Sequence, residues 1–337
     1  MKKIVITGGT GFVGRSVLER LFVHNPGSRL VVPTRRRTSG REVALLPTVD
    51  LVECNVHDAA ALPGLLHGAD ALVHLVAILH GSAQDFDRVH VQLPRKLASA
   101  CAAAGVRRVV HVSALGVGAQ APSQYLRSKA AGEAVWQQAV QLHPQLGLTL
   151  LRPSVIFGAD DRFTNLFVAL QRLFPVLPLA GANARFQPVW VGDVAQAVVN
   201  SLALSAPPGP VIECAGPEVM TLRQIVQRVG AMAGCRRPVL ALPEALGMLQ
   251  AAAMGLMPGE PLMSRDNLLS MRVPNVASNV ASNVASNVAS NVASHALGHV
   301  ATELASAGLP GLAALGIAPA SIDTLAKHFR PTDLRTR

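Results

Sequence analysis

Cysteine is scarce in this sequence. The 337 residues contain four cysteines, and no two of them form a CxxC pair. This excludes a secreted disulfide scaffold, and neither a structural zinc site nor a redox motif is supported. We expect reduced thiols in a cytoplasmic protein. The histidines form no HExxH motif, so we predict no metal, and His74 and His111 are interpreted as packed residues of expected strands.

Aromatic and acidic residues are also few. One Tyr and two Trp leave little for base stacking, and twenty Asp and Glu stand against thirty Lys and Arg, a net charge of +10. Such an excess suits nucleic acid, an anionic membrane surface or an anionic ligand. Because stacking side chains are missing, we predict no nucleic-acid partner.

No apolar run is long enough to cross a membrane. The run Ile4–Ile6 is too short for a signal peptide. The longest run, 245–257, is broken by Gln250 and is shorter than the roughly 20 residues that a span needs. We interpret it as a buried helix or one at a membrane surface. The expected location is the cytoplasm, either free or peripheral on the cytoplasmic face of the inner membrane.

What the sequence does contain is an alternation of strands and helices. Expected strands separated by helical segments have continuous apolar interiors, which is typical of a parallel sheet covered on both faces. This pattern predicts an α/β fold, a Rossmann doubly wound parallel sheet. The expected strands are 3–7, 29–33, 51–53, 71–77, 108–113 and 148–151, and the expected helices are 12–22, 91–104 and a third from about 125.

A glycine-rich turn follows the first expected strand and opens the first helix. Glycine permits a tight turn and close approach of a pyrophosphate, which the free N–H groups of the helix N-terminus can bind. We predict a dinucleotide site here, formed by Gly8, Thr10, Gly11, Phe12, Val13 and Gly14.

The second expected strand ends with arginine where NAD-binding sites usually carry Asp or Glu. Arg35 and Arg36 can hold a 2′-phosphate, so we predict that NADP(H) is preferred over NAD(H). After the third strand, Asn55, Val56 and Asp58 lie where adenine contacts are expected. Asp58 equally suits the cap of the following helix.

A Tyr-x-x-x-Lys pair supplies candidate acid–base chemistry. Tyr125, the only tyrosine, and Lys129 are four residues apart and share a helix face. A lysine charge near a phenol lowers the phenol pKa, and Lys129 can also hold the nicotinamide ribose. Ser113, at the end of the preceding strand, is expected to bind the reacting oxygen.

Together these motifs resemble the extended and atypical short-chain dehydrogenase/reductases. Later segments resemble the group named for the nucleotide-binding accessory subunit of mitochondrial complex I, subunit nine of its alpha subcomplex. They are Leu151–Gly158, Asp160–Phe163, Arg185–Ala195, Arg265–Asn267 and Leu312–Ile317. The resemblance implies that Leu75, Val76 and Ala77 line the cofactor path and that Pro153, Ser154 and Val155 contact the nicotinamide end.

The resemblance also implies a smaller, discontinuous C-terminal lobe. We assign residues 1–153 and about 187–203 to the nucleotide domain, and 154–186 with 204–330 to the second lobe. The tetrapeptide Asn-Val-Ala-Ser recurs five times over 275–294. Each copy would advance about 40° around a helix, so no apolar face forms, and we interpret the repeat as an expanded surface insert without a binding role.

Three functions remain open. The first is an NADP(H)-dependent oxidoreductase or epimerase-type enzyme acting on an unidentified, lipophilic carbonyl or quinone-related substrate. The second is a cofactor-holding accessory subunit, associated with respiratory complex I or with quinone metabolism at the inner membrane. The third is a redox-sensing regulator, which the intact Tyr125 and Lys129 disfavour. The oligomeric state is not predicted.

Overall fold

The computed structural model describes residues 1–204, 209–254, 263–279 and 308–329. Its larger lobe is built on a parallel sheet of seven strands, in the order β3-β2-β1-β4-β5-β6-β11. The carboxyl ends of all seven strands therefore meet at one edge of the sheet. The strands are β1 (Lys3–Thr7), β2 (Arg29–Thr34), β3 (Val49–Glu53), β4 (Ala71–His74), β5 (Arg108–Val112), β6 (Gly147–Pro153) and β11 (Val211–Cys214).

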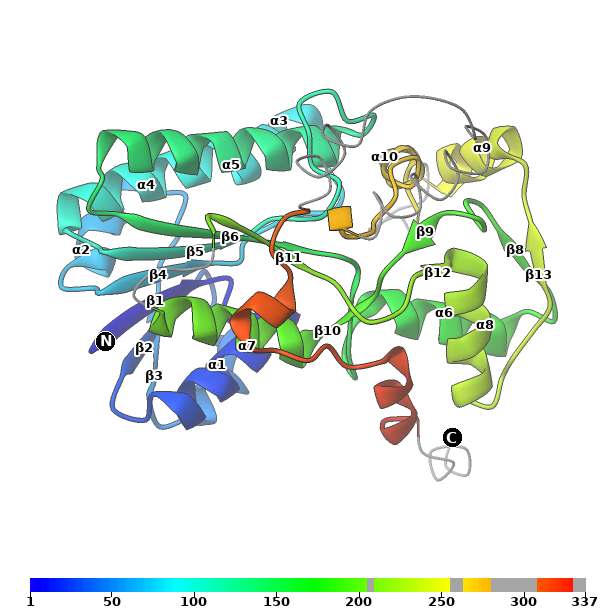
Figure 1. Ribbon diagram of the computed structural model, residues 1–337, viewed down its shortest axis with the longest axis horizontal. Coiled ribbons are helices and arrows are strands. Elements are labelled where there is room, and N and C mark those ends of the chain that lie inside the picture. The colour runs from blue at the N-terminus through cyan, green and yellow to red at the C-terminus, as the bar shows by residue number, and fades with distance from the viewer. Residues whose placement is uncertain (205–208, 255–262, 280–307, 330–337) are drawn as a thin grey trace, which may run out of the picture.

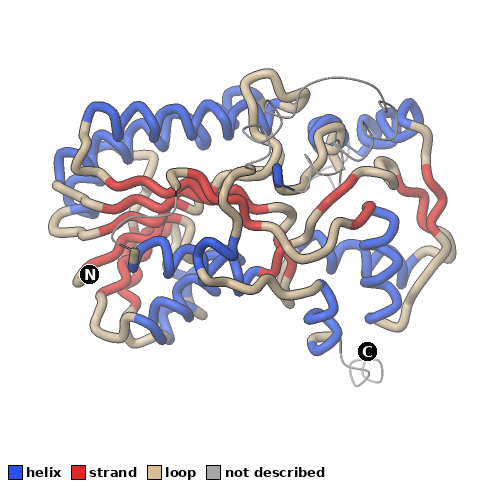
Figure 2. The backbone as a smooth tube through the Cα atoms, viewed as in Figure 1, coloured by secondary structure: helices blue, strands red, loops and turns tan. Residues whose placement is uncertain are grey.

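Helices cover both faces of this sheet (Figures 1 and 2). Apolar side chains of α1 (Phe12–His24) and α7 (Val191–Ala203) pack on one face. Those of α2 (Leu62–Leu66), α4 (Leu93–Ala104) and α5 (Gln124–Leu142) pack on the other. The prediction of a doubly wound α/β fold is confirmed, since alternate residues of each buried strand feed two separate cores.

Three expected boundaries differ from the structure. The strand expected over 71–77 ends at His74, because the chain leaves the sheet at Leu75. The helix expected from residue 91 begins at Leu93, after a π-helical turn over Arg88–Gln92. β11 was not predicted; it pairs with β6, and Leu312 and Leu315 pack in the same core. Residues of β11 and the segment around Leu312 and Leu315, which our division assigned to the second lobe, therefore pack with the large lobe.

The smaller lobe consists of short strands, helices and long loops (Figure 2). Its core gathers Phe157, Phe167, Leu222, Ile225 and Val229. Its elements are β7 (Ile156–Phe157), α6 (Arg162–Leu173), β8 (Leu177–Leu179), β9 (Arg185–Phe186), β10 (Val189–Trp190), β12 (Met220–Thr221), α8 (Leu222–Met232), β13 (Val239–Ala241), α9 (Glu244–Met254) and α10 (Arg265–Ser270).

The first copy of the tetrapeptide repeat belongs to the fold. Val276 and Ala277 are buried, and Asn275 forms a parallel bridge with Phe186. The expectation that the whole repeat is a surface insert is therefore wrong for residues 275–278. Their apolar side chains fill the junction of the lobes. Positions 280–294 lie outside the described residues.

The expected helix over 245–257 is observed as α9 up to Met254. Gly247 and Ala251 are buried on one side, whereas Leu246 and Leu249 are exposed. Residues 255–257 lie outside the described part. Within the described ranges, no helix has both the length and the apolar character needed to cross a membrane.

Candidate functional site

The glycine turn lies between β1 and α1. At β1 the strand order reverses, because β2 and β3 lie on one side of β1 in the sheet and β4, β5 and β6 lie on the other. Gly8 has a φ of +80°, and a Cβ there would lie 3.1 Å from the backbone of Leu75 and Val76. A Cβ at Gly14 would lie 2.4 Å from the carbonyl oxygen of Gly8. Both positions therefore require glycine, one for its conformation and the other for the close helix–turn contact.

The N-terminus of α1 is open to an anion. Gly11 is its N-cap, and no side chain caps the helix. Its first N–H groups and the positive end of its dipole are thus available to a phosphate. Because Gly8 touches Leu75 and Val76, the turn and the loop after β4 form one cradle. Ala77 follows in that loop and is exposed.

The arginines after β2 lie beside this cradle. Arg35 and Arg36 are exposed, and the Thr34 Oγ1 accepts a long hydrogen bond, 3.4 Å, from the Arg36 amide. A Cβ on Gly40, just beyond them, would lie 3.2 Å from the Thr10 methyl group. The chain after Arg35 therefore returns to the glycine turn.

A second basic group lies near Arg35. Burial lowers the pKa of His57, and the positive charges of Arg88, Lys96 and Arg35 lower it further. The Lys96 Nζ donates to the His57 carbonyl oxygen at 2.7 Å. Four positively charged or ionisable groups thus gather where β2 and β3 end.

The residues after β3 have local structural roles. The Asn55 side chain accepts from the His57 amide at 3.1 Å, and Asp58 caps the next turn by accepting from the Ala60 amide at 3.0 Å. The capping alternative for Asp58 is what the structure shows. Val56 is partly buried against the core, and adenine contacts of this segment stay a prediction.

Lys129 and Ser113 lie at the carboxyl end of β5, and Tyr125 lies one helical turn before Lys129 on α5. Lys129 is buried and its Nζ donates to the Val112 carbonyl oxygen at 2.8 Å, next to Ser113. The Ser113 Oγ is buried and has no hydrogen-bond partner among the described residues. A buried hydroxyl without a partner is costly unless a ligand completes it. The arrangement fits a site that binds a polar group at Ser113.

The expected lowering of the Tyr125 pKa is wrong for this structure. Burial raises the pKa of Tyr125 to about 12. Burial also lowers the pKa of Lys129 to about 8, and the nearby Glu133 carboxylate opposes that shift. The sequence argument missed this because it counted the lysine charge and not the loss of water around both groups.

The His90 ring packs against the ring of Tyr125. The ring centroids of the two residues are 5.7 Å apart in an edge-to-face arrangement. The His90 Nε2 accepts from the Ile78 amide at 3.1 Å, so Nδ1 carries the proton and donates to the Ser128 Oγ at 2.8 Å. The Ser128 hydroxyl donates in turn to the Tyr125 carbonyl oxygen. Burial lowers the pKa of His90 to about 3, which keeps this neutral tautomer in place.

Two functional residues were missed by the sequence analysis. Asp266 of α10 accepts from the amides of Gln124 and Tyr125, at 2.7 and 2.9 Å. Asn275 accepts on its Oδ1 from the Ser154 hydroxyl at 2.6 Å and from the Val155 amide at 2.9 Å. Asp266 ties α10 to the start of α5, and Asn275 holds Ser154 and Val155, which belong to the predicted nicotinamide end. Their partners lie more than a hundred residues away, so no local pattern could identify them.

Residues 153–155 therefore lie at the junction of the lobes. Leu115 donates its amide to the Pro153 carbonyl oxygen, and Ser154 donates its amide to that of Cys214. This places 153–155 beside the end of β5, where Ser113 lies. The contact of Pro153 with a cofactor stays a prediction.

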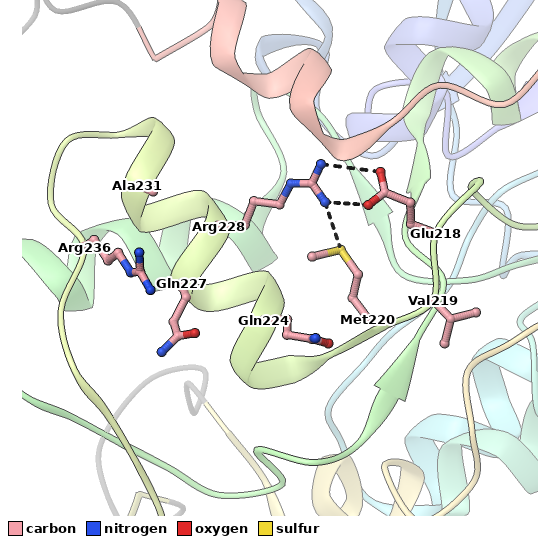
Figure 3. A pocket seen from close by; sticks show the side chains of 8 residues that line it. All are labelled: Glu218, Val219, Met220, Gln224, Gln227, Arg228, Ala231 and Arg236. Carbon is pink, nitrogen blue, oxygen red and sulfur yellow. Dashed lines mark hydrogen bonds and ion pairs between the residues drawn. The ribbon is translucent and has the colours of Figure 1, made fainter.

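A hollow of about 470 Å³ lies elsewhere on the small lobe (Figure 3). Glu218, Met220 and Arg228 line it, and none of the predicted site residues does. The Arg228 guanidinium is bound by Glu218 and by Asp323, which raises the Arg228 pKa further above its ordinary value. Arg228 thus joins α8 to the C-terminal segment and is not a free anion site.

Comparison with known proteins agrees with this geometry. The model of the NAD dependent epimerase/dehydratase family matches residues 4–215. The chain is 30% identical over 278 residues to NADH dehydrogenase (ubiquinone) 1 alpha subcomplex subunit 9 of Mus musculus, covering 80% of this chain and 72% of that protein. It is also 30% identical over 197 residues to a ceramide reductase of Caulobacter vibrioides, covering 58% of this chain and 59% of that protein.

Among solved structures, the fold is similar to UDP-glucuronic acid 4-epimerase of Bacillus cereus in complex with UDP-glucuronic acid and NAD. The TM-score is 0.62 at 19% identity, covering 82% of this chain and 95% of the epimerase. The glycine cradle and the family match together support a nicotinamide dinucleotide as cofactor. The chain therefore belongs to the NAD dependent epimerase/dehydratase family, as an extended short-chain dehydrogenase/reductase similar to subunit nine of the complex I alpha subcomplex.

Proposed function

We propose that this protein is an NADP(H)-dependent oxidoreductase that reduces a lipophilic carbonyl compound. The observation that supports the proposal is that buried Lys129, one helical turn after Tyr125, donates to the carbonyl oxygen that precedes the unpartnered Ser113 hydroxyl. The nicotinamide cofactor, when bound, supplies the hydride. All other parts of the chemistry fall to side chains of this chain.

The Tyr125 phenol suits the role of proton donor. With a pKa of about 12 it is fully protonated near neutral pH, so it can give a proton to an oxygen that gains negative charge. Lys129 then stabilises the phenolate, and Ser113 donates to or accepts from the same oxygen. Carbonyl reduction is favoured over alcohol oxidation, because oxidation would need Tyr125 to start as a phenolate.

The preference for NADP(H) rests on the arginines after β2. Arg35 and Arg36 are exposed, and Arg88 and Lys96 add positive charge near His57. A 2′-phosphate gains charge-assisted hydrogen bonds in such surroundings, whereas the ribose hydroxyl of NAD(H) gains little. In this proposal Asn55, Val56 and Asp58 border the adenine, and Leu75–Ala77 with Pro153–Val155 follow the cofactor toward Tyr125.

The substrate class is proposed from apolar residues near the site and from the comparisons. The centroid of the buried Phe86 ring lies 6.3 Å from that of the Tyr125 ring, and a Cβ on Gly116, three residues after Ser113, would lie 3.0 Å from the Val273 side chain. The likeness to a ceramide reductase supports a lipid carbonyl, and likeness to a complex I subunit supports a quinone-related one. The location we propose is the cytoplasm, with peripheral contact at the cytoplasmic face of the inner membrane.

A second function is favoured by one specific observation. The Mus musculus relative, with 80% of this chain aligned, is named as a subunit of NADH dehydrogenase. A cofactor-holding accessory subunit with little turnover would keep the same glycine cradle. In such a subunit, Tyr125 would not take part in a reaction.

One experiment separates the two. The purified protein is denatured and its bound nucleotide identified by mass spectrometry, and NADPH oxidation is then followed with keto-lipid and quinone substrates. We expect NADP(H) in the wild type and in Tyr125→Phe alike, with turnover reduced at least about a hundredfold in the variant. Bound nucleotide with no turnover in either protein would favour the accessory subunit. Copurification with respiratory complexes would then be tested.

A further inference from the structure

The end of the small lobe farthest from the large sheet exposes large apolar side chains. It is formed by the chain after α6, by β13 and by α9 (Figure 1). Leu173 is 72% exposed, Leu240 59% and Leu249 66%. Single exposed leucines are ordinary on soluble proteins, but a group of them on one end is not. We call this group the apolar end: Leu173, Phe174, Val176, Leu240, Leu246 and Leu249.

The two chain segments that carry these residues are neighbours in space. β13 pairs with β8 in parallel, with Leu240 beside Pro178. The Leu177 amide donates to the Pro238 carbonyl oxygen at 2.9 Å. α9 follows β13 directly, and a Cβ on its Gly247 would lie 2.7 Å from the Ala180 side chain. The chain after α6, β13 and α9 therefore all pack against β8 and the residues that follow it.

Exposed arginines border the apolar end. Arg172 precedes Leu173, and Arg236 and Arg237 precede β13; all three are exposed. The Arg237 Nε donates to the Gln171 carbonyl oxygen at 3.1 Å, which keeps the two arginine segments together. Among the described residues next to these arginines, the carboxylate of Glu244 is paired with Arg272. Arginines bordering protruding leucines are complementary to an anionic surface with an apolar interior.

We propose that the apolar end docks on an anionic lipid bilayer. The leucines and Phe174 would enter the boundary between headgroups and acyl chains, while Arg172 and Arg236 contact lipid phosphates. The inference deepens the proposed function, since it rests on a peripheral membrane location and names the surface responsible. A bilayer is favoured over a protein partner because the side chains protrude and are bordered by exposed arginines.

Docking there would bring lipid close to the candidate site. Behind α9 lies a small cluster formed by Ala180, Ala251 and Leu268 with the side chains of Met248, Met263 and Met271. Methionine adapts its shape to irregular apolar ligands. Leu268 belongs to α10, the helix whose Asp266 holds the amide of Tyr125. α10 therefore lies between α9 and the start of α5, so α9 and Tyr125 are linked through one helix.

The test is cosedimentation of the full-length protein with lipid vesicles. Vesicles of phosphatidylcholine with about one-third phosphatidylglycerol are compared with vesicles of phosphatidylcholine alone, at low and high salt. We expect binding at least about tenfold stronger to the anionic vesicles, and weakened by salt. The variant Leu173→Gln/Leu240→Gln/Leu249→Gln should lose at least about tenfold in binding. The variant Arg172→Glu/Arg236→Glu should lose the preference for anionic lipid.

Matched controls replace equally exposed residues elsewhere. Leu45 is 84% exposed and Leu142 69%, so Leu45→Gln/Leu142→Gln should bind as the wild type does, as should Arg95→Glu. Equal losses in variant and control would overturn the proposal, as would binding that ignores lipid charge. A wild-type dimer that becomes monomeric in the triple leucine variant would show that a second copy covers this end. Tyr125→Phe should bind vesicles normally, so loss of catalysis and loss of docking are separable.

Discussion

Arg152 of β6 and Glu133 of α5 form a two-pronged ion pair one helical turn after Lys129. The Arg152 Nε and a terminal nitrogen lie 2.9 and 2.5 Å from the two Glu133 oxygens. Glu133 is four residues beyond Lys129, on the same face of α5, and its charge opposes the lowering of the Lys129 pKa. Arg152 in turn interacts with Glu213, which accepts from the backbone and hydroxyl of Ser278.

The first prediction concerns this pair. Glu133→Gln removes the charge that opposes the lowering, so the pKa of Lys129 should fall below its present value of about 8. Lys129 would then be neutral at lower pH, and the alkaline limb of NADPH-dependent turnover should move to lower pH. Because Arg152 loses its partner in a mostly buried place, the free energy of unfolding should also fall by about 3–5 kcal/mol.

A matched control is Glu42→Gln, which breaks an exposed pair with Arg15. Its effect on unfolding should stay below about 1 kcal/mol, and the pH profile should not move. Turnover and urea unfolding measured on the same samples separate the two effects. An unchanged alkaline limb in Glu133→Gln would show that Lys129 does not set it.

The second prediction concerns cofactor choice. Replacing Arg35 and Arg36 by serine should weaken NADPH binding roughly tenfold or more and leave NADH binding nearly unchanged, because the 2′-phosphate loses its charge-assisted partners. Fluorescence titration gives both dissociation constants. Arg41→Ser, another exposed arginine of this loop, is the control. Tighter binding of NADH than of NADPH by the wild type would end the assignment.

The third prediction separates the first repeat copy from the others. Asn275→Ala removes the acceptor of two hydrogen bonds, from Ser154 and Val155, and should cost about 1–3 kcal/mol of unfolding free energy. Deletion of residues 279–294 should cost far less, since Ser278 and Leu309 are already joined by a hydrogen bond of 3.0 Å that closes this part of the chain. Shortening such a loop changes its closure entropy by only about 0.6 kcal/mol per halving.

Thermal unfolding and cofactor affinity check this contrast. Asn283→Ala, in the third copy, is the matched control for Asn275→Ala. A deletion that destabilised the protein as strongly as Asn275→Ala would show that the later copies are part of the fold.

Periodic and local features of the fold were predictable, and distant ones were not. The glycine turn at Gly8–Gly14 and the buried strands depend on short-range chemistry, so the sequence alone predicts a Rossmann sheet. β11 was missed because Val211–Cys214 is only four residues long and its apolar pattern is interrupted by Glu213. The Asp266 cap on α5 and the Asn275 clamp on Ser154 depend on the packing of the two lobes. The raised pKa of Tyr125 likewise follows from burial, which residue spacing does not report.

The last prediction concerns acid stability. Burial lowers the pKa of His74 and of His90 to about 3, and burial also lowers that of His111 well below its usual value. An unfolded chain takes up protons on these histidines as the pH falls through about 6.5, whereas the folded chain does not. The folded state therefore loses stability between pH 6.5 and 3, by about 1.4 kcal/mol per pH unit for each histidine within that window.

His111→Phe tests this sign. The His111 ring stacks on His74 with centroids 5.1 Å apart, and neither ring nitrogen has a hydrogen-bond partner among the described residues. Phenylalanine keeps the stacking and removes two buried polar atoms, so stability at pH 7.5 should be unchanged or higher. Urea unfolding at pH 7.5, 6.0 and 5.0 should show a shallower loss than in the wild type. His24→Gln, at an exposed site, should leave the slope as it is. A His111→Phe slope equal to that of the wild type would mean that His111 is protonated in the folded protein, and the neutral, packed role given to it would be wrong.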